Sequence, residues 1–231
     1  MLRTALFFLG WTRGSLGRIS DALATLNELL QMARRNGDTQ FLARVPKRIA
    51  WIHQELQDFQ YTIPHGQAGA ETTRGTRPAE AEAPPPIFSG VRSQAGTAED
   101  WLSQGDLEQA GEHARVLLAN SARHGPPKYI AVAHRILAEI AMAHGELATA
   151  EAELAAALEV FRTHPAPLVA WKTYATLGRL HGLKNDPQAA LEAFAQAADI
   201  VQRIASSVTD EPLRSTFLNA PAVQEVLRGG V

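Results

Sequence analysis

A short segment that recurs five times along the chain constrains its fold more than any other feature. The copies read GRISDA, QDFQYT, GDLEQA, GELATA and NDPQAA, and they begin at residues 17, 57, 105, 145 and 185. Successive copies are therefore spaced by about 40 residues, with one longer interval between the second and the third. Repetition at this spacing is typical of solenoids, in which each repeat buries its apolar face only by stacking on the next one.

Each copy has the residues of a turn between two helices. Apolar residues at helical spacing precede the copies and continue after them. The Gly or Asn supplies a left-handed residue that ends the first helix, and the next Asp or Glu is expected in the first turn of the second helix, where the helix dipole favours negative charge. An alanine follows five residues later, where the two helices are expected to cross, in four copies: Ala22, Ala110, Ala150 and Ala190. The sequence therefore predicts an all-α fold of antiparallel helix hairpins with a period of about 40 residues.

Further residues give the chain a resemblance to the tetratricopeptide repeat (TPR) family. A small residue comes before the end of four first helices, at Gly10, Ala50, Ala138 and Gly178, and Phe194 with Ala197 matches an aromatic-then-small pair of the family. The resemblance implies a right-handed superhelical solenoid. The period is longer than the usual ~34 residues and is similar to that of the C-terminal repeat regions of bacterial regulators, such as maltose-activator-like ATPases and ATPase–cyclase proteins. HEAT or armadillo repeats are the alternative, but the turn pattern and the lack of a third helix favour the TPR interpretation.

The repeats are interrupted once. Residues 1–62 hold repeat one and part of repeat two, and residues 98–207 hold repeats three to five. Residues 63–97 are rich in Pro, Gly and Ala and have no apolar period, so this segment is predicted to be irregular. It is either an insert between two stacks or the product of a locally shifted reading frame.

The two ends of the chain predict different contacts. Residues 208–231 are expected to cap the last repeat with short helices that begin at Pro212 and Pro221. The side chains expected to cover that repeat are Leu213, Phe217, Val223 and Val226. The first helix is apolar on nearly all sides, which predicts packing against a flanking domain N-terminal to Met1 or self-association. The residues concerned are Leu6, Phe7, Phe8, Leu9 and Trp11.

Composition excludes several functions. The formal net charge of −2 lacks the basic excess of a nucleic-acid-binding protein. The chain has no cysteine, so disulfides and cysteine zinc sites are excluded. No stretch reaches the ~20 apolar residues of a membrane span, and the apolar N-terminus lacks a signal-peptide cleavage site. We therefore expect a cytoplasmic protein that binds neither nucleic acid nor membrane.

The motifs of common enzymes are also missing. No two of the eight histidines are three or four residues apart, as a metal site on one helix requires. Neither a phosphate-binding glycine loop nor a G-x-S-x-G elbow is present. The sequence predicts no catalytic, cofactor or metal site, and hence a protein that is not an enzyme.

The TPR resemblance implies a concave groove, lined by first helices, that binds a protein or peptide. Trp51 could anchor an apolar side chain, and Arg135, Lys172 and Arg179 could meet a carboxylate. The alternative is that these charges keep a helical face soluble and that Trp51 packs between helices. The residues placed in the groove by register are Arg44, Lys47, Trp51, Gln54, Glu55, Arg135, Glu139, Met142, Lys172 and Arg179.

The function predicted from the sequence is that of a non-catalytic interaction scaffold, the TPR region of a larger bacterial signalling or transcription regulator. Two alternatives stay open. One is a repeat domain that senses a small-molecule effector and controls an attached ATPase. The other is a structural spacer between flanking domains.

Overall fold

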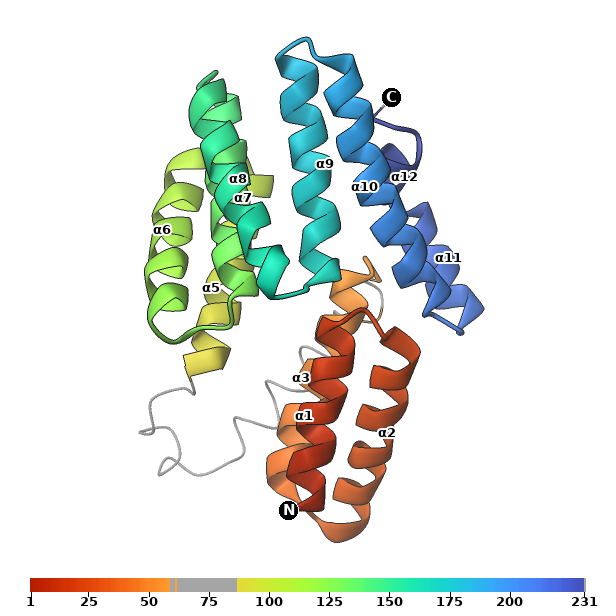
Figure 1. Ribbon diagram of the computed structural model, residues 1–231. Helices are drawn as coiled ribbons and strands as arrows, with labels where there is room; N and C mark the ends of the chain where they lie inside the picture. The colour runs from red at the N-terminus through yellow and green to blue at the C-terminus, as the bar shows by residue number, and fades with distance from the viewer. Residues whose placement is uncertain (59–60, 62–86, 231) are drawn as a thin grey trace. The chain divides into compact units, whose positions relative to one another are not determined.

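The computed structural model describes residues 1–58, 61 and 87–230 of the chain. Every regular element in these residues is a helix (Figure 1), so the prediction of an all-α fold is confirmed. The helices are α1 (Leu2–Ser15), α2 (Ile19–Asn36), α3 (Thr39–Glu55), α5 (Ile87–Ser103), α6 (Leu107–His124), α7 (Lys128–Ala143), α8 (Leu147–Thr163), α9 (Pro167–Leu183), α10 (Pro187–Ser206), α11 (Glu211–Asn219) and α12 (Pro221–Leu227).

The described residues form two compact units. Unit 1 contains residues 1–58, 61 and 201–224, and unit 2 contains residues 87–200 and 225–230. In unit 2, α5 packs on α6 and α7 packs on α8, and α7 also lies against α5 and α9. First helices of successive hairpins therefore lie side by side, as expected when hairpins stack on their neighbours. The right-handed superhelix stays a prediction.

A left-handed residue stands at the start of all five repeated segments. The φ angles are 76° at Gly17, 62° at Gln57, 80° at Gly105, 77° at Gly145 and 56° at Asn185. The same two hydrogen bonds close each turn; at the fourth, the amide of residue 145 donates to residue 142 (3.0 Å) and that of residue 146 to residue 141 (2.8 Å). This Schellman arrangement satisfies carbonyl groups at the end of the first helix. The prediction is confirmed at the glycines and Asn185, and Gln57 adopts the same conformation.

The acidic residue after the turn lies one position earlier than predicted. Asp106 is the N-cap of α6, and its Oδ1 accepts a hydrogen bond of 3.0 Å from the Gln109 amide. Asp186 does the same before α10, where Oδ1 accepts a bond of 3.0 Å from the Ala189 amide. Placement in the first turn is therefore wrong for these two residues, because their carboxylates are used to cap unsatisfied amides at the helix start.

Small residues set the distance between the helices of each hairpin. Ala22, Ala110 and Ala150 are fully buried. On the facing first helix of unit 1, a Cβ atom added at Gly10 would lie 2.8 Å from Cγ of Leu26. The backbones approach closely because these positions lack larger side chains, as the sequence predicts. Ala190, the fourth predicted alanine, is only half-buried.

Helix α5 begins ten residues before the predicted end of the irregular segment. The helix starts at Ile87, directly after the last proline of that segment. Val91, Ala95 and Ala98 are buried at a spacing of four and three residues, which is helical. The prediction of irregular structure is therefore wrong for residues 87–97, where burial of one face outweighs the ~1 kcal/mol that each helical glycine costs. Residues 63–86 of the predicted segment lie outside the described residues.

Two short helices, α11 and α12, are present where the sequence predicts them. Their four predicted core side chains are buried, with exposed fractions between 0% and 6%. The segment before α11 is bound to the first turn of the chain within unit 1. There the Ile19 amide donates to Ser207 Oγ (3.2 Å), and the Thr209 amide donates to Ser20 Oγ (2.8 Å).

Candidate partner-binding face

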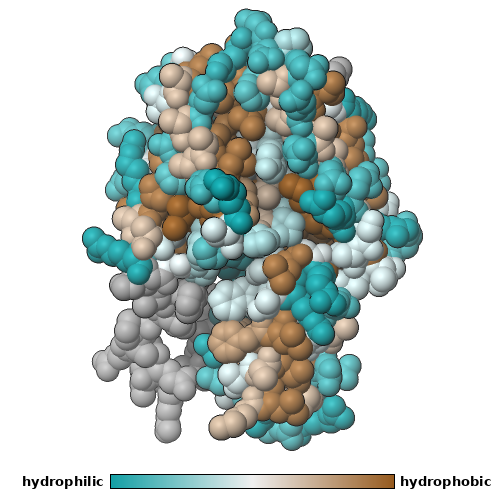
Figure 2. Space-filling view, viewed as in Figure 1, coloured by the Kyte–Doolittle hydropathy of each residue, from teal (hydrophilic) through white to brown (hydrophobic). Residues whose placement is uncertain are grey.

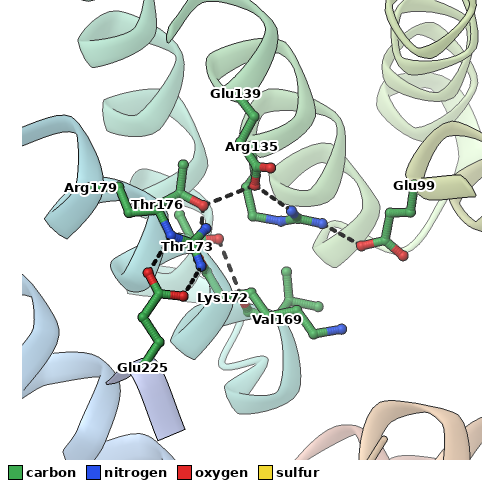
Figure 3. Close-up of polar contacts among 9 residues, drawn as sticks. All are labelled: Glu99, Arg135, Glu139, Val169, Lys172, Thr173, Thr176, Arg179 and Glu225. Atoms are coloured by element: carbon green, nitrogen blue, oxygen red, sulfur yellow. Dashed lines mark hydrogen bonds and ion pairs between the residues drawn. The ribbon is translucent and has the colours of Figure 1, made fainter. Parts of the chain in front are cut away.

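The position six residues before each left-handed turn residue is occupied by Trp11, Trp51, Glu99, Glu139 and Arg179. The last three lie on α5, α7 and α9, the adjacent first helices of unit 2. Equivalent positions on stacked helices share one face, so charged groups recur across this face at one register. Figure 3 shows two neighbouring groups of polar contacts that contain them, here together called the charged line: Glu99, Arg135, Glu139 and Thr176 form one group, and Arg179 and Glu225 form the other.

Arg135 lies at the centre of the charged line and joins two helices. Its side chain is only 8% exposed. Nη1 donates to Oε1 of Glu139 at 2.6 Å, and Nη2 pairs with Glu99 of α5. A buried guanidinium is tolerated only when carboxylates of this kind compensate its lost hydration. Arg135 is therefore a structural tie between α5 and α7.

Glu139 extends the contacts to the next helix. Its Oε1 also accepts a hydrogen bond of 2.9 Å from the Thr176 hydroxyl of α9. One carboxylate thus receives donors from two helices. The side chain of Glu139 is 24% exposed, so the bond network reaches the surface at this point.

Arg179 and Glu225 form the far end of the charged line. Arg179 Nε donates to Oε1, and Nη2 donates to Oε2, both at 2.6 Å. This two-bond geometry is the strong form of an arginine–carboxylate pair. The hydrogen bond lowers the pKa of Glu225 and raises that of Arg179. The pair attaches Glu225 to α9 within unit 2.

The structure brings together three of the residues placed in the groove from sequence, namely Arg135, Glu139 and Arg179. Lys172 lies on the same helix as Arg179, with its Nζ 5.9 Å from the ring centre of Trp171. Met142 is half-buried and packs against the core around Leu154. Because carboxylates already hold both arginines, an incoming carboxylate has to compete with them.

Three members of the charged line were missed from sequence: Glu99, Thr176 and Glu225. The register of the repeat contained a signal for Glu99, because it stands at the position of Glu139 one repeat earlier, and two stacked carboxylates require a cation between them. Thr176 and Glu225 had no such signal. Their roles depend on how α9 and α12 pack, which the repeat does not specify.

The predicted groove residues of unit 1 differ in exposure. Arg44, Lys47 and Gln54 are exposed on α3. Trp51 is 5% exposed, and its Nε1 donates to Oε1 of Glu55 at 3.0 Å. A Cβ atom added at Gly14 would lie 3.3 Å from the Trp51 ring, so this tryptophan packs between α1 and α3. It has little surface left to anchor a partner.

Metal clusters and membrane-spanning helices are both absent from the described part of the chain. Within residues 1–58, 61 and 87–230, no group of three His, Cys, Asp or Glu residues is placed to hold a metal ion. His134 instead pairs with Glu153, at 2.6 Å from Nδ1 to Oε2. No helix among these residues combines the length and apolar character needed to cross a bilayer.

Comparison with known proteins finds solved structures that are similar to this chain, but no matching family model or curated sequence. Among solved structures, BtubC (BKLC) from P. vanneervenii is 19% identical, with 89% of this chain and 88% of that chain covered and a TM-score of 0.44. The Cut9–Hcn1 hetero-tetramer of APC/C is 16% identical, with 99% and 43% covered and a TM-score of 0.48. The TPR2AB domain of yeast Sti1 in its pHSP90 complex is 16% identical, with 99% and 85% covered and a TM-score of 0.34.

Proposed function

We propose that this chain is a non-catalytic scaffold that binds a protein or peptide along the face formed by α5, α7 and α9. The observation that carries the proposal is the charged line, in which Glu99, Glu139 and Arg179 stand at one register on three adjacent first helices. Polar groups that recur from helix to helix in this way suit an extended segment that crosses successive helices. An isolated surface charge would give no such direction.

Exposure along the charged line suggests which groups meet the partner. The side chains of Glu99, Arg179 and Glu225 are 37%, 39% and 32% exposed, whereas that of Arg135 is 8% exposed. Arg135 therefore holds the helices in place, while the ends of the line are open to a ligand. Because both charge signs are present, the proposed partner segment is polar and carries both acidic and basic groups.

The setting of the scaffold rests on the TPR resemblance of the sequence. We propose that the chain is the repeat region of a larger bacterial signalling or transcription regulator. In that setting, partner binding on the first-helix face recruits another protein to the regulator.

Selection from a peptide-display library tests the binding proposal. The folded chain is the bait, and selected peptides are re-tested on the Lys172→Ala/Arg179→Ala double variant. Arg162→Ala is the matched control, because Arg162 lies on α8 away from the charged line and its side chain is 75% exposed. We expect peptides that bind the wild type and the control but lose at least tenfold in affinity for the double variant, with circular dichroism unchanged. No enriched peptide, or equal binding to all three proteins, would overturn the proposal.

A further inference from the structure

Helix α1 exposes an apolar seam along its whole length. Leu2, Leu9 and Leu16 are 65%, 43% and 47% exposed and are spaced by seven residues. Between them lie the small side chains of Ala5 and Thr12, which are also exposed. Apolar residues at this heptad spacing are typical of a seam between paired helices.

The seam carries no charged side chain. The only charged side chains of α1 are Arg3 and Arg13. Arg3 Nη1 pairs with Asp38 Oδ2 at 2.7 Å, and Arg13 Nη1 donates to Thr25 Oγ1 at 2.6 Å, so both are held within unit 1. In Figure 2, apolar side chains accordingly gather in a band over α1. An apolar face of this length without charge is unusual for a helix that meets only water.

The repeat shows what such a face does elsewhere in the chain. Ala5, Leu9, Thr12 and Leu16 of the seam have equivalents one repeat later that are all buried, with exposed fractions of 0% to 3%. These equivalents belong to the core of unit 1, where α3 packs on α2. The exposed seam of α1 thus occupies positions that the repeat uses for packing. The buried equivalents, in α3 and at its C-cap, are Val45, Ile49, Ile52 and Leu56.

We propose that the seam pairs with the α1 seam of a second copy of this chain, with the two helices antiparallel. Two charge-free faces meet without desolvating an ion. Leucines alternate with Ala5 and Thr12, so a leucine of one helix fits over a small residue of the other. A two-fold arrangement of identical faces also closes at the dimer. Phe8, which is 51% exposed beside the seam, adds apolar contact at its edge.

Sedimentation equilibrium of the whole chain tests this proposal. We expect the mass of the wild type to rise from one chain to two between about 1 and about 100 μM, as for a micromolar dissociation constant. Leu9→Glu should stay monomeric over this range. Val116→Glu is the matched control, since Val116 of α6 has the same exposed fraction of 43% and lies outside the seam. It should dimerise like the wild type.

A mixing experiment separates lost pairing from damaged folding. Leu9→Glu and Leu9→Lys chains should each be monomeric, and an equimolar mixture should recover dimers because the two facing seams then carry opposite charges. A wild type that is monomeric at about 100 μM, or a Leu9→Glu chain that dimerises fully, would overturn the proposal. Monomers that bind another protein through α1 would also count against it.

Discussion

Gly178 of α9 lies directly beneath the ring of Phe194 of α10. A Cβ atom added at residue 178 would lie 2.7 Å from two carbons of that ring. The close approach exists because glycine has no side chain, and it fixes the distance between the two helices. The same relation joins Gly10 to Leu26 in the first hairpin.

Gly178→Ala should therefore destabilise the fold by about 2 kcal/mol, because the new methyl group overpacks the contact with Phe194. Gly182→Ala is the matched control in the same helix, since a Cβ there would meet nothing within 4 Å. It should stabilise by roughly 0.5 kcal/mol through better helix propensity. Urea denaturation measures both, and a loss of equal size at the two positions would contradict the packing described here.

The left-handed turn residues give a second prediction. Gln57→Gly and Asn185→Gly should each stabilise the fold by roughly 0.5–1 kcal/mol, because glycine adopts a positive φ without steric cost. Gly145→Ala should destabilise it by about 1 kcal/mol for the opposite reason. Gly96→Ala serves as control, since Gly96 is helical, a Cβ atom added there would meet nothing within 4 Å, and the residue should gain stability from alanine. Thermal unfolding of the four variants measures these changes in stability. A stabilising effect of Gly145→Ala would contradict the left-handed turn at residue 145.

Removal of the buried guanidinium should be costly. Arg135→Ala leaves Glu99 and Glu139 without their shared cation and should destabilise the fold by about 2 kcal/mol. This loss is smaller than that for breaking a fully buried ion pair, because both carboxylates reach solvent. Arg162→Ala removes an exposed pair with Glu159 and should change stability by less than about 0.5 kcal/mol. Guanidinium denaturation of the two variants provides the comparison. Equal effects would mean that Arg135 is not a tie between α5 and α7.

The Arg179–Glu225 pair predicts a pH dependence. The hydrogen bond from Arg179 lowers the pKa of Glu225 in the folded chain, so the pair stabilises the fold above the unfolded pKa of the carboxyl group. This contribution is lost as the pH falls through the folded pKa. The stability difference between wild type and Glu225→Gln should therefore shrink from about pH 5 to about pH 3. Urea denaturation at several pH values measures it, and a difference that stays constant or grows in acid would contradict the pairing.

The sequence predicted the hairpins well because their signals are local. The left-handed residues Gly105 and Asn185 and the buried Ala110 are each recognisable within six residues of a turn. The start of α5 was missed because a proline run ends at residue 86 and two glycines obscure the apolar period of the helix. Val91 and Ala95 became informative only once their burial was known.

The candidate face was less predictable, for a physical reason. Register alone placed Arg135, Glu139 and Arg179 on one face, and Figure 3 shows them there. Register placed Glu99 in line with Glu139, but it could not show that Glu225 holds Arg179, because this ion pair depends on how the chain after α10 packs. It also could not show that Trp51 is buried against Gly14.

In the proposed function, the first helices of unit 2 form the partner-binding face. Amide chemical-shift perturbation by a selected peptide, measured by NMR on the isotope-labelled chain, locates the bound peptide residue by residue. We expect the largest shifts at residues of α5, α7 and α9 around Glu99, Glu139 and Arg179. Shifts concentrated on the second helices α6 and α8, with the charged line unchanged, would contradict the claim.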